Sequence, residues 1–296
     1  MIQNLVNAAT LGSIYTLFAL GMSLVWGTIG ILNFAHGSVF MFAAFCNFLI
    51  LKELQLPIAV MLVVGVVVGA ALSVAAYQFA FRPILRRSKD KSTAEMQMLI
   101  CGIGLASIPV AVTQLETLSN PFGYGASSFQ IHTYDLGLLQ ISNIQLIVIV
   151  GGAALAGAMV WWIKKSRDGL ALRSIGVNSE TASLMGINEP RLALTAMAIA
   201  GGLAGLAGTL LTFSFGAITA ESGDVLLLKA FAAIILGGVG SLFGTLAGAF
   251  FLAIAETVIL TQTSGSWVDA VSFGLLFVVL LLRPQGFFGV REVRRA

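Results

Sequence analysis

The sequence predicts an all-α polytopic membrane protein, and three observations carry this prediction. Of the 296 residues, 58% are hydrophobic and only 10% are charged, whereas soluble domains carry about 25% charged residues. The mean hydropathy is +0.96. The charges are confined to short segments, and the apolar runs between them are long enough to cross a membrane, which takes about 20 residues for one helix.

The composition also excludes several other classes. The 16 basic residues exceed the 13 acidic ones only slightly, and they do not cluster as nucleic-acid binding requires, so we expect no nucleic-acid partner. Cys46 and Cys101 both lie inside apolar runs and are expected to be packing residues. No basic segment precedes the first apolar run and no A-x-A site follows it, so this run is expected to be a retained span.

The uncharged runs predict about nine transmembrane helices, within a range of eight to ten. No run alternates with period two, and only helices or closed barrels satisfy the backbone in lipid. The stretches 4–51 and 226–262 are long for one helix and short for two, so broken or re-entrant segments are expected there. The predicted spans are 4–27, 30–51, 57–81, 95–115, 141–163, 191–214, 226–239, 241–262 and 267–283.

Basic residues set the expected orientation. The segments 82–95 and 164–191 hold five Lys or Arg each, and the tail from Arg283 holds four more: Arg283, Arg291, Arg294 and Arg295. The segments between them carry mainly acids. Because cytoplasmic loops are enriched in Lys and Arg, we expect these three segments inside, the N-terminus outside and the C-terminus in the cytoplasm.

Two breaks in the apolar pattern resemble each other. Residues 37–40 read GSVF and residues 240–243 read GSLF, and each opens a new apolar run. Paired breaks in two halves indicate a duplicated transporter fold with its pathway at the breaks. Chance is the alternative for so short a likeness. Asn33 and His36 in the first break are expected to satisfy the broken backbone, to line the pathway, or to do both.

Enzyme motifs and intramembrane charge relays are missing. The chain has no GxxxxGK[ST] and no HExxH, and His36 and His132 are its only histidines, so we expect no catalysis, metal or cofactor. Glu256 lies well inside an apolar run, where an acid costs roughly 2.5–3.5 kcal/mol. We expect it to be a structural partner of Lys229; a role in transport is the alternative. Glycines spaced by four, as at Gly65 and Gly69, predict close helix packing.

The segment 164–191 is the most informative one outside the apolar runs. It reads KKSRDGLALRSIGVNSETASLMGINEPR, and apolar residues at 170, 172 and 175 and at 182, 185 and 187 predict two short amphipathic helices. Gly176 and Gly186 are expected stops, and Asn178 or Ser179 an expected cap. Such a helix suits a groove on another protein; lying on anionic lipid is the alternative.

An ordered set of stretches resembles a known family over nearly the whole chain. On these stretches the chain is similar to the branched-chain amino acid ABC transporter permeases, H-type (LivH-like) subunit. They are ATLGSIYTLFALGMSLVWGTIGILNFAHG (9–37), FRPILRRS (81–88), ISNIQL (141–146), RDGLALRSIGVNSETASLMGIN (167–188), LLLKAFAAIILGGVGSLFGTLAGA (226–249) and RPQGFFG (283–289).

The resemblance implies an ABC importer permease fold, with residues 1–296 as one transmembrane domain in a bacterial inner membrane. It implies a non-catalytic subunit that moves branched-chain amino acids by alternating access, powered by two cytoplasmic ABC ATPases. A second homologous permease and a periplasmic or extracellular substrate-binding protein would be further partners, beside membrane lipid. The outer segment 116–140 would face the binding protein, and 164–191 would be the ATPase coupling loop.

The resemblance also implies site residues. The translocation pathway would hold Asn33, Phe34, Ala35, His36, Gly37 and Ser38 in the first break and Gly237, Gly238, Gly240 and Ser241 in the second. The ATPase coupling residues would be Gly169, Arg173, Gly176, Asn178, Ala182, Gly186 and Ile187.

One departure bears on the substrate. Ser38 stands where many relatives carry an acid, directly after NFAHG. Close relatives with similar motifs serve urea and short amides, so a urea or short-amide importer permease is the alternative. A self-sufficient secondary carrier is the less favoured alternative, because it would need an intramembrane charge relay.

Overall fold

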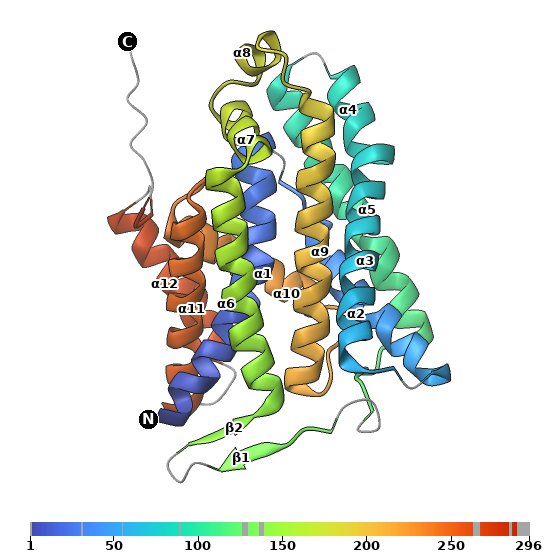
Figure 1. The fold of residues 1–296 in the computed structure, drawn as a ribbon, viewed down its shortest axis with the longest axis vertical. Coiled ribbons are helices and arrows are strands. Elements are labelled where there is room, and N and C mark those ends of the chain that lie inside the picture. The colour runs from blue at the N-terminus through green and yellow to red at the C-terminus, as the bar shows by residue number, and fades with distance from the viewer. Residues whose placement is uncertain are drawn as a thin grey trace.

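The computed structural model describes residues 2–30, 32–54, 56–88, 90–125, 130–135, 139–262, 267–283 and 286–288. Over these residues the chain is a bundle of helices with one short β-hairpin (Figure 1). The N-terminus lies beside the hairpin, at what we term the β end; α7 and α8 lie at the opposite end, the α7–α8 end (Figure 1). Arg291, Arg294 and Arg295, and parts of 116–140, lie outside the described residues.

Twelve α-helices and one π-helical turn make up the described bundle, together with two strands. The strands β1 (Thr133–Asp135) and β2 (Gln140–Ser142) pair antiparallel. The helices are α1 (Ile2–Ile29), α2 (His36–Glu53), α3 (Ile58–Ala76), η1 (Tyr77–Phe81), α4 (Arg82–Arg87), α5 (Lys91–Thr117), α6 (Asn143–Lys165), α7 (Arg167–Val177), α8 (Ser179–Leu184), α9 (Glu189–Phe215), α10 (Ser222–Gly237), α11 (Leu242–Gln262) and α12 (Val268–Leu282).

A helix lies at each of the nine predicted spans, and the prediction of an all-α polytopic membrane protein is confirmed. Six helical stretches within the described residues are long and apolar enough to cross a membrane: α1, the continuous α3–α4 run, α5, α6, α9 and α11. Helices α2 and α12 contain shorter apolar stretches. Helix α10 has 16 residues, about 24 Å of helix, which is less than the ~30 Å hydrocarbon core.

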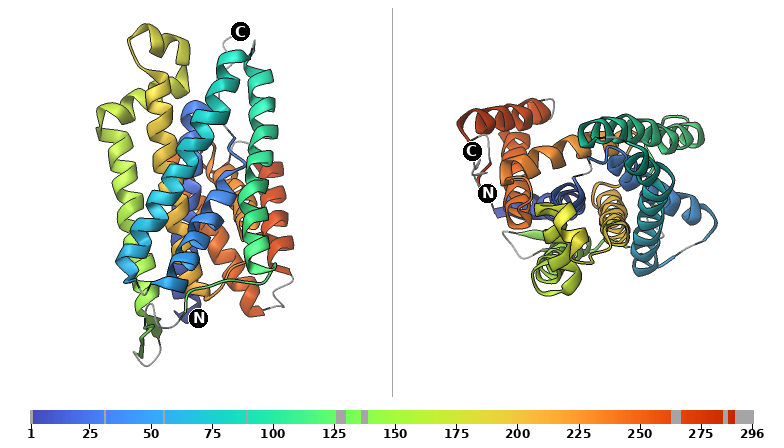
Figure 2. Two further views of the ribbon diagram at one scale, coloured as in Figure 1. Left: turned by 90° about the vertical axis from the view of Figure 1, so that its right-hand side faces the viewer. Right: turned by 90° about the horizontal axis from the view of Figure 1, so that it is seen from above.

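Helices α1 and α9 form the centre of the bundle. Nearly all of α1 and most of α9 are buried, whereas α3, α5 and α6 expose most of their surface. Seen along the bundle, α3, α5, α6 and α12 lie at the rim (Figure 2). The side chains exposed there are largely apolar, as lipid contact requires. The interior is therefore built around the helix that leads into the first break.

Glycines bring α3 and α9 into direct backbone contact. A Cβ atom on Gly69 would collide with the carbonyl oxygen of Gly201, and one on Gly201 with that of Gly69. Gly65 and Gly205 make the same contact one turn along. Lipid tails are as apolar as Leu, so close van der Waals packing is a main source of helix association in membranes. The prediction of packing glycines is confirmed here.

A buried ion pair joins α10 to α11. Lys229 Nζ lies 3.1 Å from each Glu256 oxygen. Tyr15 Oη donates to Oε2 at 2.7 Å and Ser272 Oγ donates to Oε1 at 2.9 Å. Glu256 is 1% exposed, and a buried carboxylate is tolerated when charge and hydrogen bonds compensate it. The expected structural pairing of Glu256 with Lys229 is confirmed.

Candidate functional site

The first break lies between α1 and α2 and is closed by local hydrogen bonds. Gly30 follows α1 with φ +73°, a conformation that glycine adopts without steric cost. The Asn33 Oδ1 atom accepts from the Ala35 N–H at 3.1 Å, and the Asn33 carbonyl accepts from the His36 N–H at 3.2 Å. Helix α2 then begins at His36. Asn33 therefore satisfies broken backbone, as expected.

His36 ties the start of α2 to the middle of α1. Its Nε2 atom lies 3.3 Å from the Phe18 carbonyl oxygen, and the two ring centroids are 4.6 Å apart. Asn33, Ala35, His36, Gly37 and Ser38 are all buried, and Phe34 is partly exposed. His36 therefore has a structural role, but Phe18 lies inside α1, so the His36 ring does not satisfy the broken backbone as predicted. Pathway lining by these residues stays a prediction, and Phe34 is the one among them that borders a cavity.

The start of α2 also meets the start of α10. A Cβ atom on Gly37 would collide with the Gly223 carbonyl oxygen, and one on Gly223 with the Gly37 oxygen. In addition, the Phe34 ring lies 5.3 Å from the Phe231 ring of α10, centroid to centroid. The first break is therefore packed against α10 on both sides of residue 36.

The second break lies between α10 and α11. Gly238 and Gly240 have φ values of +98° and +83°. Ser241 begins α11: its Oγ atom accepts from the Gly244 N–H at 3.0 Å, as N-cap residues do. The Cβ position of Gly27 in α1 lies 3.0 Å from Gly240 Cα. The structure thus brings the end of α1, just before the first break, against the second break.

The two similar tetrapeptides occupy different positions. Gly37 and Ser38 lie inside the first turn of α2, and the Ser38 Oγ atom donates back to the Ala35 carbonyl. Gly240 instead has a left-handed conformation, and Ser241 caps α11. Equivalent residues of a structural repeat would share their place in the helix. This geometry favours chance over duplication as the reason for the tetrapeptide likeness.

Residues 286–288 close the second break, which the sequence did not predict. The Phe287 and Phe288 N–H groups donate to the Leu236 and Gly237 carbonyls at 2.8 and 3.0 Å. The last carbonyls of a helix lack partners within it, and lipid offers none. The only sequence signal was the motif RPQGFFG at 283–289, which the resemblance included without a role. Gly286, with φ +73°, packs against the end of α10.

The segment 164–191 folds as two short helices, as predicted. Asn178 caps α8 through its Oδ1 atom, which accepts from the Thr181 N–H at 2.9 Å. Gly186 ends the turn after α8 with φ +83°. Gly176, the other expected stop, lies inside α7, one residue before its end. The expected cap and one of the two expected stops are therefore confirmed.

The structure divides the expected coupling residues into two groups. Gly169 and Ala182 are buried and Ile187 is half-buried, so these three hold the segment on the bundle. The others are exposed: Arg173, Gly176, Asn178 and Gly186.

The same segment presents an apolar tip that the sequence analysis missed. We define this tip as Val177, Leu184 and Met185, which are 89%, 83% and 80% exposed. Of the six apolar residues that predicted the helices, Leu170 and Met185 point to the surface. Alternation of apolar and polar residues does not reveal which apolar face finds a partner within the chain.

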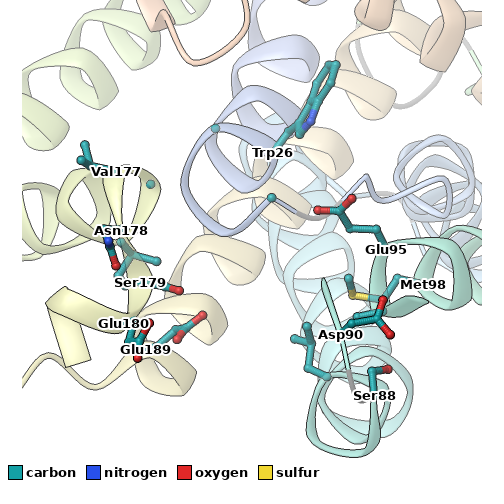
Figure 3. Close-up of a pocket in the computed structure, with 16 residues that line it drawn as sticks. Trp26, Ser88, Asp90, Glu95, Met98, Val177, Asn178, Ser179, Glu180 and Glu189 are labelled. Atoms are coloured by element: carbon teal, nitrogen blue, oxygen red, sulfur yellow. The ribbon is translucent and has the colours of Figure 1, made fainter. Parts of the chain in front are cut away.

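A cleft of about 670 Å³ opens beside this segment, at the α7–α8 end. It reaches Trp26 and Gly30 at the end of α1. Asp90 and Glu95 line one wall and Glu180 and Glu189 the other, with the two groups facing each other across the opening (Figure 3).

Asp90 also caps α5. The Thr93 N–H and hydroxyl donate to its carboxylate at 2.9 and 2.8 Å. These bonds favour the charged form and hold the pKa of Asp90 below its usual value of 3.8. The cleft is thus an acidic opening that leads to the first break.

Helices α1, α9 and α10 around two broken segments, with a patterned segment at one end, define a membrane transport protein. Residues 4–280 match the family model described as the permease component of the branched-chain amino acid transport system. The chain belongs to this family. In the described residues, no group of three or more His, Cys, Asp or Glu side chains could hold a metal ion.

Relatives support the same assignment. The high-affinity branched-chain amino acid transport system permease protein LivH of Escherichia coli K12 is 33% identical, over 99% of this chain and 97% of its own. Its counterpart BraD of Pseudomonas aeruginosa is 30% identical over the same shares. The autoinducer 2 import system permease protein LsrC of Salmonella choleraesuis is 30% identical, but over 43% of this chain and 39% of its own. No solved structure matches.

Proposed function

We propose that this chain is the membrane-spanning subunit of an ATP-driven importer for branched-chain amino acids. The observation that carries the proposal is near full-length similarity to LivH and BraD, on a fold whose second broken segment packs against the end of α1, just before the first. Substrate would pass by alternating access between the two ends. The chain would act as a single permease domain and catalyse no reaction itself.

We propose the partners from the two ends of the bundle, the α7–α8 end and the β end. ATPase subunits would dock at the α7–α8 end, where the apolar tip of Val177, Leu184 and Met185 stands exposed. That end would be cytoplasmic, since it carries the basic segments 82–95 and 164–191. The N-terminus would lie outside. The substrate-binding protein would meet the β end, and a second permease would complete the transmembrane pair.

The coupling role can be tested on the apolar tip. Leu184→Asp and Met185→Asp place a charge where an apolar contact is proposed, so ATPase association and ATP-dependent uptake should both fall sharply. Ser183→Asp is the matched control, because it adds the same charge at an exposed neighbour without removing an apolar side chain. Normal uptake by the two tip variants, at equal levels of inserted protein, would refute the coupling assignment.

The substrate is tested by uptake of labelled leucine and labelled urea in cells that lack only this gene. We expect leucine uptake to be lost and then restored by the gene, with urea uptake unchanged. Loss of urea uptake alone would assign the chain to the urea and short-amide branch. Uptake without any ATPase partner would instead favour a self-sufficient carrier.

A further inference from the structure

A second cavity, of about 510 Å³, lies between α5 and α10. Phe34 of the first break borders it, and Ile103, Val110, Leu227 and Leu228 supply apolar walls. Its volume falls within the about 300–1,000 Å³ of small-molecule sites, which are mostly apolar with a few placed polar groups. The cavity is therefore of the right kind for a small, largely apolar ligand.

The polar groups of this cavity are few and distinct. Asp224 and Gln114 both line it. Among the residues that the structure describes, no donor reaches the Asp224 carboxylate. The Gln114 Nε2 atom donates to Glu221 Oε1 at 2.6 Å; an amide nitrogen carries two N–H groups, so one remains for a ligand. An acceptor with negative charge and an N–H donor thus border one apolar space.

We infer that this cavity binds an aliphatic α-amino acid. The ligand's ammonium group pairs with Asp224, its carboxylate accepts from Gln114, and its side chain lies against Ile103, Val110 and Leu227. An aliphatic amino acid carries these three features together, whereas urea lacks the charges and the apolar part. The inference rests on the proposed function and assigns the substrate to a defined place in the bundle.

The position of the cavity suits a transport site. Phe34 borders it and also contacts Phe231 of α10, so a ligand here touches both the first break and the helix that leads to the second. The cleft at the α7–α8 end reaches Gly30 at the other side of the same break. Gly30 thus borders the acidic cleft, and Phe34, four residues further on, borders the amino acid cavity.

The test uses the assembled transporter in proteoliposomes, with its second permease, ATPases and binding protein, and measures labelled leucine uptake per folded complex. Asp224 is exposed without a ligand, so Asp224→Asn should lower kcat/KM for leucine by about 10-fold or more, the effect of losing one hydrogen bond to a charged group. Asp224→Glu should restore part of it. Val110→Trp fills the cavity and should also abolish uptake.

Val112→Trp is the matched control, because Val112 lies on the same helix, is exposed, and does not line the cavity; its uptake should be unchanged. If the unmodified complex takes up no leucine, the proposed function fails. If the unmodified complex does so and Asp224→Asn and Val110→Trp match it, the cavity assignment is overturned while the proposed function stands. Equal loss in Val110→Trp and Val112→Trp would also overturn it.

Discussion

Removing Lys229 from the buried ion pair between α10 and α11 should destabilise the protein far more than neutralising both of its members. In Lys229→Met, the Glu256 carboxylate keeps only its two hydroxyl donors, at 2.7 and 2.9 Å. In Glu256→Gln, one amide oxygen replaces the two carboxylate oxygens at 3.1 Å from Lys229 Nζ, and the negative charge is lost. Lys229→Met thus leaves the Glu256 carboxylate inside the bundle without the cation that pairs with it.

Such a change costs about 3–5 kcal/mol, whereas replacing a whole buried pair by neutral groups is often nearly neutral. We therefore expect Lys229→Met to lose about 3 kcal/mol of unfolding free energy or more, and Lys229→Met/Glu256→Gln together to lose less than Lys229→Met alone. The measurement is equilibrium unfolding in mixed micelles of the unmodified protein, the two single variants and the double variant. Lys164→Met, which removes an exposed charge at the end of α6, should change stability by no more than about 0.5 kcal/mol.

Additivity would refute this reasoning. If the double variant loses the sum of the single losses to within about 0.5 kcal/mol, the two side chains are not coupled. A loss below about 1 kcal/mol in Lys229→Met would show that water or detergent solvates the Glu256 carboxylate. A structural pair also leaves transport intact, so leucine uptake per folded complex should be retained in the double variant.

Two further predictions concern packing and pH. Gly69→Val should sharply reduce the yield of monodisperse protein, because a Cβ atom there meets the Gly201 backbone; Gly104→Val, in open space, should not. Acidification should remove the α5 cap. The folded pKa of Asp90 is below 3.8, so its contribution is present above pH 3.8 and is lost as the pH falls through the folded value. The protection of the Thr93 amide against hydrogen exchange, relative to an unstructured peptide at the same pH, should fall over that range, and Asp90→Ala should abolish the pH dependence of this protection.

Span positions could be predicted because lipid imposes them. A charged residue near each end of an apolar run limits where a helix can lie, so the predicted 57–81 and 141–163 agree closely with the start of the α3–α4 run and with α6. The ion pair of Glu256 was predictable on the same ground, since a lone acid in an apolar run needs a partner and Lys229 lies near the outer end of the preceding span.

Contacts between distant segments could not be predicted in this way. Nothing in the local sequence shows that the N–H groups of Phe287 and Phe288 meet carbonyls at the end of α10. Apolar residues such as Ile103 and Val110 of α5 give the same sequence pattern whether they face lipid, another helix or a cavity. The sequence therefore did not reveal the cavity beside Asp224. The same ambiguity hid the exposed tip at Leu184, because exposure depends on which neighbours the folded bundle supplies.

The closure of the second break by residues 286–288 has a consequence for the order in which the protein matures. Ribosomes deliver α10 and α11 first, and Phe287 and Phe288 emerge only after α12. Until then, the Leu236 and Gly237 carbonyls lack their final donors, and water must solvate them. The newly inserted α10–α11 hairpin thus keeps two hydrated carbonyls at its turn. This water is displaced only when the chain beyond α12 docks and supplies the two N–H donors.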